Sequence, residues 1–163
     1  MEDEKKYQFS VTNIAFKTAI KAVLIYIFIF LFMKLIGLVH IYQLRYLNTL
    51  ALFLSTQYAL KEISLKTDNN LEYLTGLGVS TLIGFVSFSL FAFFMFFYLT
   101  FFDPALMQYF IEHAPFGRYL TPLNTCAWLV IEGLGIQLSF TLTIMEYFKW
   151  MQHKLRSGKE LIK

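Results

Sequence analysis

The chain has 163 residues, of which 57% are hydrophobic and 19% aromatic, and its net charge is +3. Soluble domains are roughly 45–50% apolar. Here the excess lies in four long runs, each near the roughly 20 residues that cross a bilayer, so composition predicts an integral membrane protein rather than a soluble domain. The single Cys126 excludes an internal disulfide and a cysteine-based metal cluster.

The first elements expected along the chain are a polar segment over 1–14 and a membrane helix over 15–39. The start does not predict a cleavable signal peptide, because it opens with Glu2-Asp3-Glu4 and its apolar run is too long. After a short turn, a second and less hydrophobic helix is expected over 45–63. A polar loop then follows over 64–70, where turn-forming residues gather.

The second half of the chain predicts two more membrane helices, over 71–102 and 124–150, and a basic tail over 151–163. Asp103 and Pro104 form a helix-start signal. They indicate a short amphipathic helix over 104–113, lying on the outer membrane face. The expected fold is therefore all-α, a four-helix membrane bundle in a single domain.

The positive charges indicate the orientation of this bundle, because basic flanks are retained on the cytoplasmic side. Among 14 Lys and Arg residues, only Lys34, Arg45 and Arg118 fall on the outer side. Both termini are thus expected in the cytoplasm. Because orientation already explains the basic groups, no nucleic-acid partner is expected. The cytoplasmic set is Lys5, Lys6, Lys17, Lys21, Lys61, Lys66, Lys149, Lys154, Arg156, Lys159 and Lys163.

Small residues recur at three- and four-residue steps in three of the helices, which places them on shared faces. Such faces let membrane helices approach closely, so the pattern predicts packing inside the bundle. A hydrated groove lined by the same faces is the alternative. The expected helix-packing residues are Ala51, Ser55, Ala59, Gly76, Ser80, Gly84, Gly135 and Ser139.

Glu132 and Lys34 are the two charges expected within the membrane. A carboxylate there is costly and needs a protein or water environment. Glu132 is expected to pair with Lys34 at similar depth or to be protonated. The alternatives are a proton relay, contact with a partner subunit, and a Lys34 that simply extends to the outer surface.

No catalytic, metal-binding or cofactor-binding residue is predicted. His40, His113 and His153 lie at helix ends or outside the bilayer, where none can ligate a buried haem. A P-loop and a dinucleotide-binding fingerprint are both absent from the sequence. An enzyme is therefore not expected.

The stretch 71–76 (LEYLTG), followed by Gly84, Ser87, the Phe102-Asp103-Pro104 junction and Tyr109, resembles an uncharacterised family of small bacterial four-helix membrane proteins. The resemblance covers about a quarter of the chain. It implies four crossings of the bacterial inner membrane. It implies no activity and transfers no functional residue.

Two functions are consistent with these patterns. The first is a non-catalytic accessory or assembly subunit, whose partners are the lipid bilayer and other integral membrane subunits. The alternative is a small proton-coupled transporter or channel component, working as a homo-oligomer with Glu132 as its ionisable centre. Small size and minimal soluble mass favour the first.

Overall fold

The computed structural model describes residues 2–38, 46–66, 71–114 and 117–160, and within these ranges every regular element is helical. The all-α prediction is therefore confirmed. The elements are α1 (Glu2–Leu35), α2 (Tyr46–Lys66), α3 (Tyr73–Phe97), the π-helical turn η2 (Tyr98–Phe102), α4 (Pro104–His113), the 3-10 turn η3 (Gly117–Tyr119) and α5 (Pro122–Glu160).

Three of the described helices are long and apolar enough to cross a membrane, over Val11–Leu35, Tyr73–Phe102 and Pro122–Lys154. This supports a membrane protein. α2 is not among them, and its sequence carries Asn48 and Gln57 as well as the charged residues of its last turns. Its 21 residues nevertheless extend over ~32 Å. Four crossings therefore remain a prediction.

Both bounds of α1 differ from those expected, for local reasons. α1 begins at Glu2 rather than near residue 15, since residues 2–14 contain neither Gly nor Pro and continue the helix. It ends at Leu35 rather than near residue 39, because Gly37 adopts φ 73°. The Leu38 amide then donates to the Met33 carbonyl at 2.9 Å, which closes the helix end.

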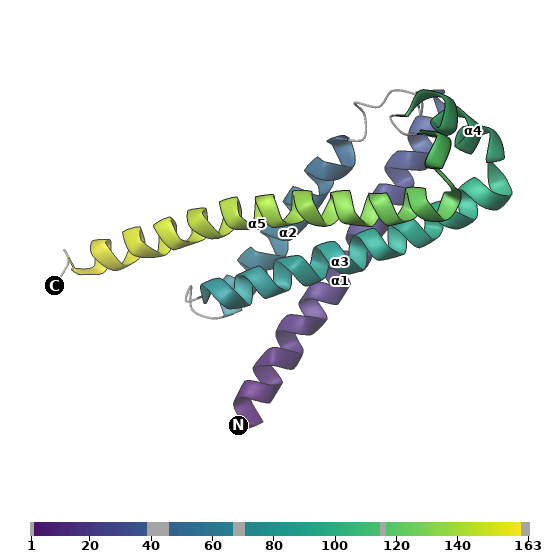
Figure 1. Cartoon of the computed structure of the whole chain (residues 1–163). Helices are drawn as coiled ribbons and strands as arrows, with labels where there is room; N and C mark the ends of the chain where they lie inside the picture. Colours follow the sequence, from purple (N-terminus) through teal and green to yellow (C-terminus); the bar gives the residue numbers. More distant parts are fainter. Residues whose placement is uncertain (1, 39–45, 67–70, 115–116, 161–163) are drawn as a thin grey trace.

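The last helix is also longer than the predicted span 124–150. α5 begins at Pro122, where proline suits the first helical position, and the Thr121 hydroxyl accepts from the Asn124 amide at 3.2 Å. It continues to Glu160, through the basic segment expected to be a tail. Figure 1 shows the end of α5 projecting beyond the helices around it.

The helices alternate in direction, and contacts at both ends show it. The end of α1 meets the start of α4 through Lys34 and Asp103. At the opposite end, Gln152 near the end of α5 donates to the Leu71 carbonyl at 3.2 Å, just before α3. α1 and α3 therefore run one way, and α5 returns beside α3 (Figure 1). α2 is also antiparallel to α1, because Lys66 near its end lies opposite Lys17.

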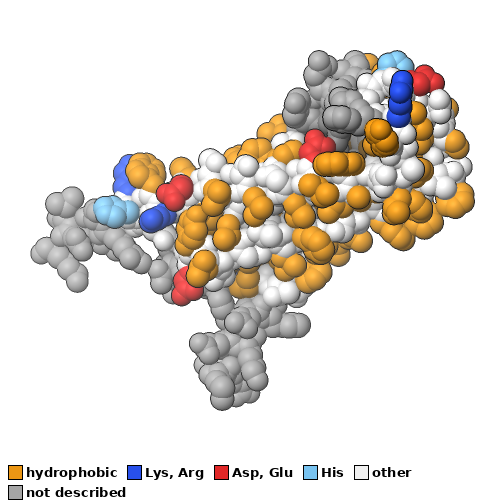
Figure 2. Space-filling view, viewed as in Figure 1, with side chains coloured by type: hydrophobic (Ala, Val, Ile, Leu, Met, Phe, Trp, Pro, Cys, Tyr) orange, Lys and Arg blue, Asp and Glu red, His pale blue; other side chains and the backbone are white. Residues whose placement is uncertain are grey.

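The core forms two apolar clusters, one toward each end of the bundle. The first joins α1, α2, α3 and α5 around Ala15, Ile63, Val79 and Met145. The second is rich in aromatic rings and reaches α4, with members that include Tyr26, Phe88, Phe91, Met95 and Leu106. Large apolar side chains also cover much of the outer surface over α3 and α5, as Figure 2 shows. A surface of this kind suits lipid or other membrane helices.

Candidate helix-packing surfaces

Glycines build the interface between α3 and α5. A Cβ on Gly84 would lie 2.5 Å from Gln137 Cγ, and a Cβ on Gly133 would collide with the Phe88 ring. Because these positions lack side chains, the two backbones approach closely, which is how membrane helices gain packing energy. Gly84 was predicted from its spacing, whereas Gly133 was not.

Beside Gly84, polar groups from three helices converge in the interior. Gln137 Nε2 on α5 donates to the Ser80 carbonyl of α3 at 2.8 Å and to Thr56 Oγ1 of α2 at 3.2 Å. The Thr141 hydroxyl donates to the Gln137 carbonyl at 2.8 Å. These groups are hydroxyls, a side-chain amide and two backbone carbonyls, which hydrogen-bond without titrating near neutral pH. The cluster therefore fixes how α2, α3 and α5 meet.

The structure separates the predicted packing residues into three groups. Ala59, Gly76, Ser80 and Gly84 are buried, and Ala51 and Ser55 are half-buried on α2. Gly135 and Ser139 lie on the exposed side of α5, so their prediction as residues packed inside this chain is wrong.

The error at Gly135 and Ser139 has a geometric cause. α5 carries two small or polar series, one through Gly133, Gln137 and Thr141 and one through Gly135 and Ser139. The two series are offset by two residues, or about 200° around a helix of 3.6 residues per turn. They therefore occupy opposite sides, and the spacing does not tell which side faces inward. The four-residue spacing of Gly133, Gln137 and Thr141 could have indicated that these residues share a packing face.

The expected pair between Lys34 and Glu132 is also wrong. Lys34 Nζ instead bonds to Asp103 Oδ2, and this pair joins the end of α1 to the start of α4. Glu132 is exposed on α5, roughly 15 Å along the helix from Pro122. It therefore lies far deeper along the bundle than the end of α1.

The position of Glu132 along the membrane span follows from that of its neighbour Gly133. Gly133 lies against Phe88, near the middle of the apolar span Tyr73–Phe102. Glu132 thus lies near mid-span on the outward side of α5, away from the cluster around Gln137.

The described histidines lie near the ends of their helices. His113 closes α4, with Nδ1 at 3.0 Å from the Tyr109 carbonyl and its ring stacked on the Tyr109 ring. His153 is exposed near the end of α5, and His40 lies outside the described residues. Among the described residues, no group of three or more His, Cys, Asp or Glu is placed to hold a metal ion.

Comparison with protein-family models, curated proteins and solved structures finds no match to this chain. The resemblance to small bacterial four-helix proteins therefore stays a prediction.

Proposed function

We propose that this protein is a non-catalytic accessory or assembly subunit that packs against another integral membrane protein. The observation that carries the proposal is the outer small-residue face of α5, formed by Gly135, Ser139 and Thr143. All three are exposed and follow one another at four-residue steps. A Cβ at Gly135 would meet nothing within 4 Å, so in the described part of the chain no helix fills this position.

The hydroxyls of this face are already satisfied by its own helix. Ser139 Oγ donates to the Gly135 carbonyl at 3.0 Å, and Thr143 Oγ1 donates to the Ser139 carbonyl at 3.1 Å. Lipid or a partner helix could therefore cover them without leaving an unpaired hydroxyl. The face offers close backbone approach, the same property that Gly84 provides to α5 on the inner side.

Large apolar side chains border the outer small-residue face. Ile131, Leu138 and Leu142 are all exposed on α5, at 60%, 44% and 50% of their surface. A strip of small residues beside a row of bulky side chains can receive the ridge of another helix. The surface that this face would contact is thus a transmembrane helix. That helix would belong to the larger membrane complex that the sequence leads us to expect.

We place this subunit in a bacterial inner membrane with four crossings and both termini in the cytoplasm. The alternating helix directions support this placement, because they bring Lys17, Lys66 and Lys154 toward one end of the bundle. Lys34 and Arg118 lie toward the other end. One strongly basic end is typical of the cytoplasmic side.

Substitution of the outer small-residue face tests the proposal. Gly135→Leu adds a side chain that would block close approach by a partner helix. Gly78→Leu is the matched control, since Gly78 is also exposed and a Cβ there also meets nothing within 4 Å. Mild-detergent extraction, native gels and mass spectrometry would follow the complex. We expect Gly135→Leu alone to release the chain from its complex; retention of both variants in the complex contradicts the proposal.

The transporter alternative makes a different prediction for the same experiment. Because Glu132 is exposed on α5, a path using it would run between this chain and a neighbouring copy. The chain would then migrate as a homo-oligomer with no other subunit. Loss of pH-coupled uptake in Glu132→Gln, with assembly intact, would support that alternative over an accessory role.

A further inference from the structure

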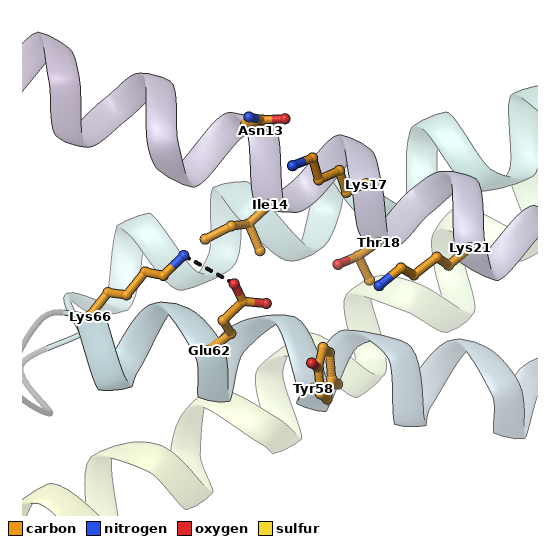
Figure 3. A pocket seen from close by; sticks show the side chains of 8 residues that line it. All are labelled: Asn13, Ile14, Lys17, Thr18, Lys21, Tyr58, Glu62 and Lys66. Carbon is orange, nitrogen blue, oxygen red and sulfur yellow. Dashed lines mark hydrogen bonds and ion pairs between the residues drawn. The ribbon is translucent and has the colours of Figure 1, made fainter.

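A polar cleft of about 330 Å³ lies between the first half of α1 and the last half of α2 (Figure 3). It is at the basic end of the bundle, within a few turns of the start of the apolar span at Val11. Its lining includes Asn13, Lys17 and Lys21 from α1, and Tyr58, Glu62 and Lys66 from α2.

The charges of the cleft favour an anion. Among the residues that the structure describes here, three lysine ammonium groups line the cleft against one carboxylate, that of Glu62. Glu62 Oε1 accepts from Lys66 Nζ at 3.0 Å, so this carboxylate already has a cation of its own. Figure 3 shows the Lys17 side chain running along α1 toward Asn13 and the Lys21 side chain extending toward Thr18 and the space between the two helices. A phosphate group could accept hydrogen bonds from both amines and from the Tyr58 hydroxyl.

An apolar strip continues from this polar cleft along the same two helices. On α1, Leu24 and Phe28 follow Lys21 at three- and four-residue steps and are 62% and 69% exposed. On α2, Leu54 and Leu50 precede the cleft at four-residue steps and are each 55% exposed. Residues at such steps share a helix face. A polar anion site therefore borders an apolar surface suited to acyl chains. The polar cleft and the apolar strip together match an amphiphile.

We propose that the cleft between α1 and α2 binds a phosphate group, carried by an anionic phospholipid whose acyl chains lie on the apolar strip. Basic pockets between membrane helices hold acidic lipid headgroups in this way. Lys17 and Lys21 contact the phosphate, and Lys66 balances Glu62. The site is separate from the outer small-residue face of α5, so Gly135→Leu is expected to leave lipid binding unchanged.

The test titrates the full chain, in uncharged detergent, with dioleoylphosphatidylglycerol and counts bound lipid by native mass spectrometry. The double variant Lys17→Gln/Lys21→Gln is expected to bind roughly 30-fold more weakly, since each lysine near a lipid headgroup contributes about fivefold. The matched control Lys149→Gln/Lys154→Gln removes the same charge from exposed positions of α5 and should change the Kd by less than about twofold. Equal weakening in the two double variants would show diffuse attraction and overturn the proposal.

A substitution in the opposite direction guards against damage to the fold. Glu62→Gln removes the one carboxylate found among the described lining residues and frees Lys66, so it should tighten phosphatidylglycerol binding by about fivefold. Unchanged or weaker binding would contradict a phosphate in this position. Phosphatidylcholine serves as the zwitterionic control lipid. Its affinity for the wild-type chain and for these variants should be the same.

Two soluble competitors identify the carrier of the phosphate. If inorganic phosphate and glycerol 3-phosphate fail to displace the lipid, the acyl chains contribute and the phospholipid is the ligand. If either competitor displaces it at equal concentration, the carrier is a soluble phosphate, and the lipid assignment is wrong. If the lipid and both competitors bind the wild-type chain and Lys17→Gln/Lys21→Gln with equal affinity, the cleft is not a phosphate site.

Discussion

At the scale of single residues, the glycines of α3 differ sharply in what their missing side chains allow. Gly84 lies against Cβ and Cγ of Gln137, which are close to the backbone and cannot move aside easily. Gly76 faces the thioether end of Met145, which is flexible. Gly78 faces open space. Three glycines on one helix therefore differ in how well each would tolerate an added side chain.

We predict that Gly84→Ala destabilises the protein by about 1–3 kcal/mol, because an added methyl forces α3 and α5 apart. Gly76→Ala should cost less, since Met145 can change rotamer. Gly78→Ala should be neutral or stabilising by up to about 1 kcal/mol, because alanine favours the helix. Thermal unfolding in detergent measures all three, and equal effects would show that the close contact at Gly84 does not limit packing.

The hydrogen bond between Gln137 and Thr56 permits a second prediction at this scale. Gln137→Leu and Thr56→Val each remove one partner of the 3.2 Å bond between α5 and α2. Interhelical hydrogen bonds in membranes contribute ~0.6 kcal/mol on average and up to ~1.7 kcal/mol. A double-mutant cycle should therefore give a coupling energy of about 0.5–1.5 kcal/mol. Additive effects would mean that the bond contributes nothing beyond packing.

At the scale of elements, Asp103 determines how α4 begins and how it is attached. Its Oδ1 accepts from the Leu106 amide at 3.1 Å, which caps α4, and its Oδ2 pairs with Lys34 at the end of α1. The pair holds the turn after α3 against α1, while Leu106 and Met107 bury the inner side of α4. The Asp103 carboxylate thus both caps the start of α4 and attaches that start to the end of α1.

The two contributions of Asp103 can be separated by substitution. Asp103→Asn keeps a capping side chain but removes the charge, whereas Asp103→Ala removes both. We expect faster hydrogen exchange at the Leu106 amide in Asp103→Ala than in Asp103→Asn, with a capping difference of about 1 kcal/mol. Lys34→Met should resemble Asp103→Asn. Identical exchange in all three variants would show that the cap does not stabilise α4.

At the scale of the whole molecule, the central question is whether α2 crosses the membrane. Its polar residue Thr56 is fully buried, as are Leu52 and Leu60, while Leu50 and Leu54 point outward. α2 therefore buries Thr56 inside the bundle and presents Leu50 and Leu54 to its surroundings. Its charged residues gather at the end that lies beside Lys17. This arrangement favours a crossing even though α2 is less apolar than the other long helices.

We expect the amino and carboxyl ends to lie in the same compartment and Tyr119 to lie in the other. With Cys126 replaced by Ser, single cysteines at His153 and Tyr119 should react with a membrane-impermeant maleimide from opposite sides of intact cells. Reporter fusions at each terminus provide the independent measurement. Termini in different compartments would mean that only the three strongly apolar helices cross.

The sequence by itself determined the helical class, three of the four apolar spans that it predicted, and the start of α4 at Asp103-Pro104. These features depend on neighbouring residues, so they can be predicted without long-range contacts. It also placed Gly84 and Ala59 on inner faces, because each helix there has one dominant series of small residues. The tertiary structure alone decided which of two opposite series on α5 faces inward, that Lys34 pairs with Asp103, and that lysines from α1 and α2 share a cleft. Each of these depends on the rotation and depth of one helix relative to another, which the periodicity of a single helix does not contain.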